Sequence, residues 1–525
     1  MPTPSGSSRF PTFEELMRKL ILTLAVLSVA ALVAIGCGKA DEVASGASEL
    51  VPAGSVIYGE ATLKPEGDQK EAIDAILAKF PGGGQARDKL KDLIERGMRE
   101  SDSPVSFKED IEPWLGDEAA FFVSNLSPGR DAQSAAALIA AKDEDKAQAA
   151  LEKSAEGELS KDNYKDVEVL TDESDEAGAV FDGFLVLGTE AGVKAAIDTS
   201  KGGKKLSEDE RYKDALDDAA DDRLGFFYMN SPELLRSLRE AGTPLPDSFR
   251  KFFEEPLVAT LDADEDGVTF EGTVPEVIGR ASLFGQASDL VEELPGDSWL
   301  GMAQSDFGKL IDFYVDAFAD VAGGRDMVEQ LLTAATGLDL QRDVIDWMGD
   351  FGVFVRGTTE SDLDGALIIE TRDEAASDRF ISALGRLAKS QADNPGDHIG
   401  PLTAPGGGKG ITFTSRSFPK PIHVFQQDGT VVFAYGDAAA SDAVKPASKL
   451  GDSAGYTAAR DSLGDYDISF FLLAKPILDL VDSTDSAIDA EWQKAKPYLE
   501  PLNALVGGTS GDGHSLRSAL KLVVK

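Results

Sequence analysis

The same series of motifs occurs twice along this sequence, offset by about 230–245 residues, and this duplication limits the folds open to the chain. The stretch "DIEPWLGDEAAFFVS" at 110–124 corresponds to "DVIDWMGDFGVFVRG" at 343–357. Likewise, "RYKDALDDAADDRLGFFYMN" at 211–230 corresponds to "GYTAARDSLGDYDISFFLLA" at 455–474. Two copies of this size predict a tandem pair of homologous domains and not a solenoid, which needs more and shorter units.

Each copy alternates short apolar strands with amphipathic helices. In the first copy we expect helices near 68–80, 85–99 and 143–154, among short strands. The segment "PLVATLDADEDGVTFEGTV" predicts a hairpin, because two alternating strands flank "DEDG". Most connections between strands are too short for crossover helices. We therefore predict an α+β fold of two tandem homologous domains, each a largely antiparallel sheet with helices packed on one face.

The motifs also set the expected boundaries. We predict a signal peptide over 1–36, a flexible tether over 37–48, repeat 1 over 49–275, a connecting segment over 276–293 and repeat 2 over 294–525. The first 16 residues do not resemble the start of a signal peptide, so Met17 is a candidate for the true translation start. The pattern does not decide whether the repeats form separate domains or one continuous sheet.

The segment before residue 38 is typical of an exported protein. A basic pair at 18–19 precedes an apolar run at 20–35, which is too short to span a bilayer. The run leads to Cys37, the only cysteine of the chain. The stretch "AIGC" at 34–37 resembles a bacterial lipobox, in which a peptidase cuts before the cysteine and its sulfur receives lipid. We predict a lipoprotein anchored to the outer face of the cytoplasmic membrane, with an ordinary signal peptide or an uncleaved anchor as alternatives.

The charge of the chain excludes several partners. It has 51 Lys and Arg against 93 Asp and Glu, which gives a formal net charge of −42. Such a field repels nucleic acids and anionic lipid headgroups, so we expect no nucleic-acid binding. Membrane attachment is expected through acyl chains, whose affinity does not depend on surface charge. The acidity indicates a solvated extracytoplasmic surface, with a cationic partner or loosely held divalent ions as the alternatives.

Several of these pieces together resemble a known bacterial family. They are the signal with its cysteine, the opening "LVPAGSVIYGEATLKPEGDQ" at 50–69, the "W(L/M)GD" turns, the stretch "DGFLVLGTEAGVKAAID" at 182–198 and the duplication. The chain is similar to the domain of unknown function 3352 family, which are secreted or lipid-anchored proteins whose activity is not established. The resemblance covers nearly the whole mature chain. Because its motifs are structural, it implies a fold and a cellular location and no mechanism.

Two tryptophans stand at equivalent positions of the two copies. Trp114 and Trp347 each precede Gly-Asp and an apolar strand. We interpret both as core residues at the point where helix meets sheet, and stacking on a ligand is the alternative. The Gly-Asp pairs that follow are interpreted as turns into the strand and not as catalytic acids.

Three acids match the first half of a calcium loop: Asp262, Asp264 and Asp266. The twelfth position of such a loop needs a bidentate acid, and Thr273 stands there. Asp-Gly between alternating apolar residues is also a strong hairpin signal. We therefore predict a hairpin, keep these acids as weak calcium candidates, and expect no other metal site and no cofactor. The histidines lie far apart without metal-ligand spacing: His398, His423 and His514.

The sequence lacks local signatures of catalysis, since it has neither a G-x-S-x-G elbow nor an H-E-x-x-H helix. We predict a non-enzymatic extracytoplasmic lipoprotein that binds or scaffolds an unidentified envelope protein or apolar ligand. A second hypothesis is a carrier of an apolar or lipid ligand in a cavity between sheet and helices. A third is a carboxylate-based hydrolase, which would need two acids about 5–10 Å apart.

Overall fold

The computed structural model describes most of the chain from Gly46 onward. The described residues are 46–100, 104–126, 133–154, 160–172, 176–217, 219, 223–240, 242, 255–275, 285–391, 398–404, 407–416, 418–484, 489–511 and 515–525. The predicted signal peptide, Cys37 and the tether up to residue 45 lie outside them, as does the first half of the predicted connecting segment. No helix among the described residues is both long and apolar enough to cross a membrane.

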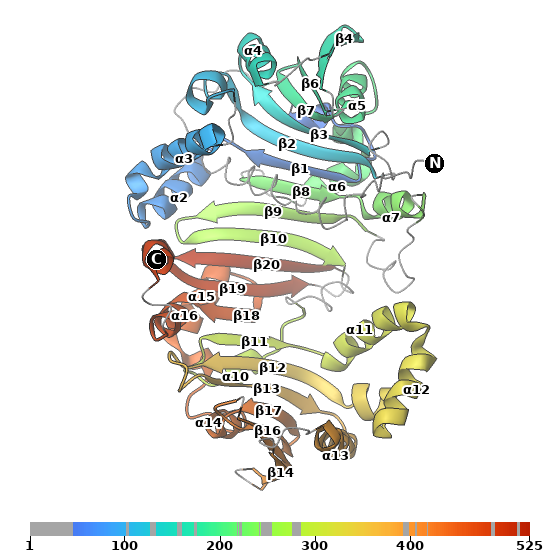
Figure 1. Ribbon diagram of the computed structural model, residues 1–525, viewed down its shortest axis with the longest axis vertical. Coiled ribbons are helices and arrows are strands. Elements are labelled where there is room, and N and C mark those ends of the chain that lie inside the picture. The colour runs from blue at the N-terminus through green and yellow to red at the C-terminus, as the bar shows by residue number, and fades with distance from the viewer. Residues whose placement is uncertain are drawn as a thin grey trace, which may run out of the picture. The chain divides into compact units, whose positions relative to one another are not determined.

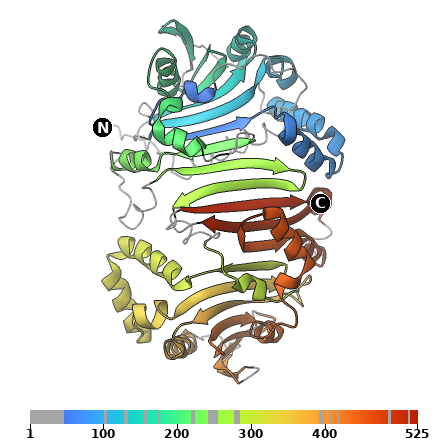
Figure 2. The same cartoon turned by 180° about the vertical axis from the view of Figure 1, so that it is seen from behind.

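The chain divides into two compact units. Unit 1 extends to Leu77 and continues over Gly82–Tyr228, and unit 2 contains Ala78–Pro81 and Met229–Lys525. Each unit is an α+β structure built on an antiparallel sheet (Figure 1, Figure 2). The fold class and the antiparallel pairing therefore agree with the prediction from the sequence.

In unit 1 the strands pair in the order β8–β1–β2–β3–β7–β6–β5–β4. All pairs from β1 to β4 are antiparallel. The strands are β1 (Ile57–Thr62), β2 (Leu115–Leu126), β3 (Gln133–Ala141), β4 (Ser160–Tyr164), β5 (Val167–Thr171), β6 (Glu176–Phe181), β7 (Phe184–Thr189) and β8 (Gly225–Met229).

Both faces of the unit 1 sheet carry buried side chains. On β3, Ile139 and Ala141 belong to an apolar cluster with Trp114 and α4, whereas Ala136 and Leu138 are buried on the opposite face. The helices and single turns of this part of the chain are η1 (Ala47–Glu49), α2 (Gly67–Ala78), η2 (Gly83–Gln85), α3 (Ala86–Glu100), η3 (Phe107–Ile111), α4 (Glu144–Ser154), α5 (Glu190–Ser200), η5 (Leu206–Glu208) and α6 (Glu210–Asp217).

In unit 2 the strands pair in the order β9–β10–β20–β19–β18–β11–β12–β13–β17–β16–β15–β14, and every pair is antiparallel. The strands are β9 (Leu257–Asp264), β10 (Gly267–Pro275), β11 (Leu300–Gln304), β12 (Met348–Arg356), β13 (Asp364–Thr371), β14 (His398–Thr403), β15 (Lys409–Thr414), β16 (Ile422–Gln427), β17 (Thr430–Tyr435), β18 (Asp467–Leu473), β19 (Leu502–Gly511) and β20 (Ser515–Val524).

Helices pack on both faces of the unit 2 sheet at β13, so the predicted one-sided packing is wrong. On β13, Ala366 and Ile368 join a core with α10, α14 and α15, whereas Leu367 and Ile369 join a second core with α11 and α13. Strands that are apolar on both faces need cover on both sides, as in buried sheets. The helices and turns are α7 (Ser231–Glu240), α10 (Leu290–Glu293), α11 (Phe307–Ala322), α12 (Arg325–Thr336), η7 (Gln341–Ile345), α13 (Glu374–Gln391), α14 (Asp437–Asp442), η8 (Leu450–Asp452), α15 (Ala454–Leu463), α16 (Ala474–Asp482) and α17 (Ala490–Leu499).

One order of strand pairing occurs twice in the chain. The order β18–β11–β12–β13–β17–β16–β15–β14 in unit 2 matches the order β8–β1–β2–β3–β7–β6–β5–β4 in unit 1. The predicted hairpin is present as β9 and β10, and β10 pairs with β20. This hairpin, which the sequence assigned to repeat 1, is therefore part of the unit 2 sheet. The homology of the two repeats stays a prediction.

Candidate binding surface

One face of the unit 2 sheet carries two continuous rows of apolar residues. Residues directly opposite one another on antiparallel strands share a face, so the strand register defines the rows. The first row crosses from β9 to β12 through Ala263, Val268, Leu522, Leu505, Leu472, Leu300 and Val355. The second row lies beside it and reaches β17 through Leu261, Phe270, Leu520, Gly507, Phe470, Met302, Val353, Leu367 and Phe433. We call these two rows the apolar stripe.

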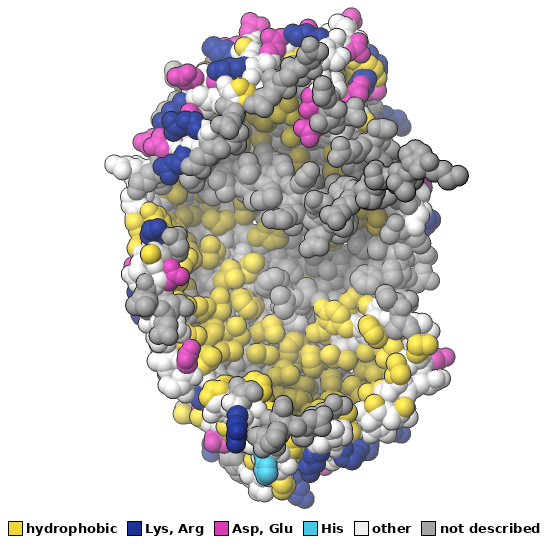
Figure 3. Space-filling model, viewed as in Figure 1, with side chains coloured by type: hydrophobic (Ala, Val, Ile, Leu, Met, Phe, Trp, Pro, Cys, Tyr) yellow, Lys and Arg dark blue, Asp and Glu magenta, His cyan; other side chains and the backbone are white. Residues whose placement is uncertain are grey.

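The apolar stripe is long and free of ionisable side chains. It crosses nine strands, which at a spacing of about 4.8 Å gives a length of roughly 38 Å. Neither row contains a charged residue, although 93 of the 525 residues of the chain are Asp or Glu. Figure 3 shows a broad apolar area over the strands of unit 2 and over α11 and α12. Apolar area of this extent on a protein surface marks a site of interaction.

The apolar stripe is partly open, whereas the opposite face of the same strands is closed. Apart from Ala263 and Gly507, every residue of the stripe keeps some exposure, which reaches 51% at Phe270 and 37% at Leu522. On the opposite face, Phe354 and Phe471 are fully buried beneath α10, α14 and α15. Both faces are therefore apolar, and they differ in how far helices cover them.

A helical hairpin of α11 and α12 borders the apolar stripe at β12. Three residues of α11 pack in one apolar cluster with the stripe: Phe307, Leu310 and Ile311. Four large apolar side chains of the hairpin are largely exposed: Tyr314 (54%), Phe318 (61%), Met327 (48%) and Leu331 (63%). The side of α11 that packs against the stripe therefore continues into solvent at Tyr314 and Phe318, which follow Leu310 and Ile311 at helical spacing.

The charges between the two helices of the hairpin are paired. Arg325, the first residue of α12, lies 2.6 Å from Asp312 and 2.5 Å from Asp316, both on α11. The turn between the helices is made by Gly323 and Gly324, with φ of 101° and 109°, a region that favours glycine. The ion pairs hold the start of α12 against α11.

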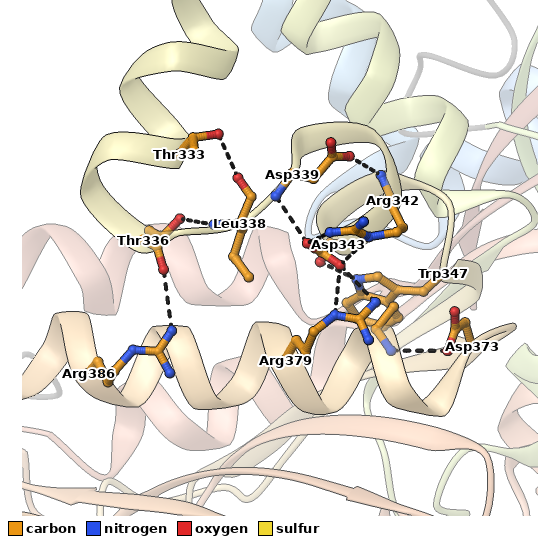
Figure 4. Close-up of polar contacts among 11 residues, drawn as sticks. Thr333, Thr336, Leu338, Asp339, Arg342, Asp343, Trp347, Asp373, Arg379 and Arg386 are labelled. Carbon is orange, nitrogen blue, oxygen red and sulfur yellow. Dashed lines mark hydrogen bonds and ion pairs between the residues drawn. The ribbon is translucent and has the colours of Figure 1, made fainter.

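A buried carboxylate joins the turn that follows the hairpin to helix α13 (Figure 4). Asp343, on the π-helical turn η7, lies 2.7 Å from Arg342 and 2.8 Å from Arg379, and it accepts a hydrogen bond of 3.0 Å from the backbone N–H of Asp339. The hydrogen bond from Arg342 holds the pKa of Asp343 well below its usual range. The indole of Trp347, which is fully buried, donates to the carbonyl oxygen of Asp343 at 3.1 Å.

Unit 1 has the same local arrangement before β2. The π-helical turn η3 precedes Trp114, which is 2% exposed and donates to the carbonyl oxygen of Asp110 at 2.5 Å. The next residue but one is glycine for a steric reason, because a Cβ on Gly116 would lie 2.6 Å from the Cβ of Ala140. A Cβ on Gly349 would lie 2.9 Å from a backbone oxygen of β13. Both motifs therefore bring their strand close to its neighbour.

A second polar cluster lies in unit 1 around Glu118, on β2. Its two carboxylate oxygens accept hydrogen bonds of 3.0 and 3.2 Å from the backbone N–H of Ala47. Burial raises the pKa of Glu118 to about 7, against a lowering by the Ala47 bond, and the charge of Glu60 adds to the rise. Glu60 accepts a 2.7 Å bond from the hydroxyl of Tyr58 and lies 2.8 Å from Arg223. Both acids thus have structural partners, and Glu118 holds the first described residues against the sheet.

Comparison with known proteins identifies the family. A family model described as "Protein of unknown function (DUF3352)" matches residues 20–396. The chain belongs to this family. No curated protein matches the chain. Among solved structures, one titled "Structure of crystal form I of TP0453" is 9% identical, covers 44% of this chain and 79% of that chain, and has a TM-score of 0.23, which is too low to carry an argument.

The calcium candidates of this DUF3352 protein surround the β9–β10 turn. The carboxylate of Asp264 accepts backbone bonds from Asp266 at 2.9 Å and Gly267 at 3.0 Å, and it lies 2.5 Å from the Lys521 ammonium. Within the described residues, no group of three or more His, Cys, Asp or Glu could hold a metal ion. His423 bonds to Asp437 at 2.8 Å, His398 lies on β14, and Cys37 and His514 lie outside the described residues.

Neither the apolar stripe nor the exposed apolar residues of the α11–α12 hairpin were predicted from the sequence of this DUF3352 protein. The second has a local signal, since Tyr314 and Phe318 on α11 and Met327 and Leu331 on α12 are each spaced four residues apart. The stripe has no local signal, because its neighbours come from strands that are far apart in the sequence. Only the strand register brings them together.

Proposed function

We propose that this protein is a non-enzymatic binding protein of the bacterial cell envelope, anchored through lipid on Cys37, which carries an apolar ligand on the apolar stripe. The stripe is the observation that supports the ligand class, because its two rows are partly exposed and hold no ionisable group. Removal of apolar surface from water contributes about 25 cal/mol per Å². A hydrocarbon ligand would gain this term without leaving a buried charge unpaired.

The position of the apolar stripe within the sheet also favours a hydrocarbon ligand. Its strands, apart from β9 at the edge, pair on both sides, so their backbone N–H and C=O groups are largely engaged in the ladder. A ligand on this face would find few hydrogen-bonding partners. The hydrocarbon of one membrane leaflet is roughly 15 Å deep, and the part of the stripe outside the cluster with α11 and α13, from β9 to β18, is roughly 19 Å long, so it can hold an acyl chain.

The acids most suggestive of chemistry have structural partners, which supports a role without catalysis. Asp343 is held by two arginines, Glu118 by the backbone of Ala47, and Asp264 by Lys521 and its own turn. An acid that serves as a general base must reach the proton that it removes. Carboxylates that clamp loops and turns are poorly suited to that role.

The anchor is tested by metabolic labelling of cells with an alkyne fatty acid. The wild-type chain should take up label and fractionate with the membrane from the extracytoplasmic side. A Cys37→Ala chain should lose the label, because the sulfur is the acceptor. A Cys37→Ala chain that still carries label would overturn the proposed anchor.

The ligand is tested with a fluorescent fatty acid whose emission rises in an apolar site. Phe270→Ser and Leu522→Ser should each weaken its binding about fivefold, since each removes a partly exposed side chain of the stripe. Thr269→Ser is the matched control, because Thr269 lies on β10 but faces the other side of the sheet. Equal binding by all four proteins, or no binding by the wild type, would overturn the proposed ligand.

A further inference from the structure

One side of α11 is apolar from Phe307 to Phe318, but the sheet covers only its first part. Phe307, Leu310 and Ile311 pack in one cluster with the apolar stripe, and Tyr314 and Phe318 follow them at helical spacing. The exposed fraction of the side chain rises along this side to 54% at Tyr314 and 61% at Phe318. The apolar side of α11 therefore continues for about two helical turns beyond the part that packs on the stripe.

The second helix of the hairpin extends this exposed surface. A Cβ on Gly323, which ends α11, would lie 3.3 Å from the terminal methyl group of Met327, so Met327 lies against the end of α11. Met327 and Leu331 are one helical turn apart on α12 and are 48% and 63% exposed. We call Tyr314, Phe318, Met327 and Leu331 the hairpin patch. The hairpin patch holds four of the ten large apolar side chains found exposed in the described part of the chain, within 18 residues of sequence.

The hairpin patch and the open part of the apolar stripe are joined through β11. Met302 of β11 belongs to the cluster with α11, and it pairs with Phe470 of β18, where the open part of the stripe begins. From Phe470 the open part continues to β9 over roughly 19 Å, whereas α11 leads from the same cluster to the hairpin patch. Figure 3 shows apolar area over the strands of unit 2 and over both helices. Two apolar surfaces of unit 2 thus branch from one cluster.

We propose that the hairpin patch is a second part of the ligand-binding surface, and that the ligand is a lipid with two acyl chains and a headgroup without net negative charge. The inference rests on the proposed function, because it takes the open part of the stripe as the site of the first chain. That part is long enough for one chain, since the hydrocarbon of one leaflet is roughly 15 Å deep. The second chain follows α11 and removes the hairpin patch from water.

The charges of the hairpin favour a headgroup of this kind. Asp312, Asp316 and Glu329 share the guanidinium of Arg325, at 2.6, 2.5 and 3.8 Å, so the acids outnumber the base between the two helices. The net charge of the whole chain is −42, which repels an anionic headgroup. A phosphatidylethanolamine headgroup has no net charge and avoids this repulsion.

The size and chemistry of the hairpin patch favour a lipid over a protein partner. A stable protein–protein interface buries about 800 Å² on each partner and uses about 20–30 residues a side, whereas the patch has four. Such an interface also carries about one hydrogen bond per 100–200 Å², and of the four side chains only that of Tyr314 can donate one. A hydrocarbon chain needs no hydrogen bond.

The test compares two fluorescent probes that differ by one acyl chain. The first is a short-chain phosphatidylethanolamine with the fluorophore on one of its two chains, and the second is its lyso form, which keeps only the labelled chain. We expect the wild type to bind the two-chain probe about tenfold more tightly than the lyso probe. Phe318→Ser and Leu331→Ser should each weaken binding of the two-chain probe about fivefold and leave binding of the lyso probe unchanged.

Two control variants and a third probe separate the parts of the surface. Phe270→Ser, on the stripe, should weaken binding of both probes. Tyr498→Ser, at a side chain of α17 that is 51% exposed and outside the hairpin, should weaken binding of neither. A phosphatidylglycerol probe with the same two chains should bind more weakly than the phosphatidylethanolamine probe, and added salt should reduce this difference.

Four results would overturn the inference. They are equal affinity of the wild type for the two-chain and lyso probes, an equal effect of the hairpin variants on both probes, tighter binding of the phosphatidylglycerol probe, and a wild-type dimer in light scattering that Phe318→Ser abolishes. The last result would assign the hairpin patch to a second copy of the chain. Any of these results leaves the proposed ligand of the stripe standing as long as the lyso probe binds, whereas binding of neither probe would overturn both proposals.

Discussion

Replacement of Glu118 by glutamine tests the electrostatics of unit 1. Burial of this carboxyl raises its pKa from 4.5 to about 7 in the folded protein. A difference of this size corresponds to about 3 kcal/mol, because one pKa unit is worth about 1.4 kcal/mol. The folded state binds the proton more tightly than the unfolded state, so it is the protonated form that stabilises the fold.

The sign of the pH dependence follows from this direction. The contribution of Glu118 to stability is fully present below about pH 4.5 and is lost as the pH rises through about 7. Glutamine cannot ionise, yet its amide oxygen can still accept the bond from the Ala47 N–H. Glu118→Gln should therefore match the wild type near pH 4 and exceed its free energy of unfolding by roughly 3 kcal/mol near pH 8.5.

Urea unfolding of both proteins, followed by circular dichroism at several pH values, measures this difference. The wild-type midpoint should fall between about pH 5 and about pH 8.5 by more than that of the variant. Glu71→Gln, at an exposed position on α2, controls for the loss of one negative charge from an acidic chain. Parallel midpoints for wild type and Glu118→Gln across this range would refute the assignment of a raised pKa to Glu118.

Three further perturbations test the polar contacts of unit 2. Asp343→Asn should lower the free energy of unfolding by about 1.5–3 kcal/mol at neutral pH, since it removes charge-assisted bonds from two arginines. Because the pKa of Asp343 is lowered, thermal melts of wild type and variant should converge as the pH falls below the usual range of an aspartate. Arg356→Met should lower the free energy of unfolding by about 3–5 kcal/mol, because Arg356 is 9% exposed and pairs with Asp364 at 2.6 Å. The double variant Arg356→Met/Asp364→Leu should recover part of the melting temperature, and a failure to recover it would contradict this account. Calcium added to the chain in a calorimeter should give no heat above dilution, since Asp264 is already paired with Lys521, and a saturable heat that Asp264→Asn removes would contradict it.

Much of the architecture could be predicted from local patterns. The helices expected near 68–80, 85–99 and 143–154 correspond to α2, α3 and α4, because their apolar residues recur at the helical period. The hairpin around "DEDG" was predicted from alternation and the Asp-Gly turn. Antiparallel pairing followed from short connections, which exclude crossover helices.

The predicted one-sided packing failed for a reason that is visible in the strands. The stretch "ALIIE" in β13 is apolar at consecutive positions, so both faces of the strand need cover. Alternation was expected to leave one face polar, as it does on β10, where Thr269 and Glu271 face away from Phe270. The helix-covered strands and the hairpin strands thus follow different patterns within one sheet.

The apolar stripe could not be predicted because it depends on register across distant segments. Leu300 and Leu472 are neighbours only because β11 pairs with β18, and Leu522 joins them through β19. No periodicity within a single window contains this information. The π-helical turns before Trp114 and Trp347 were also beyond prediction, since a π-turn differs from an α-turn by one residue in its hydrogen bond.

The place of β20 in the sheet has a consequence for how the protein is made. This last strand of the chain lies between β10 and β19, and its Leu520 pairs with Phe270, about 250 residues earlier. At a synthesis rate of 5–20 residues per second, β10 stays without this partner for roughly 12–50 s. The sheet of unit 2 therefore closes only after β20 has been synthesised, and the proposed export of an unfolded chain would gain from this delay.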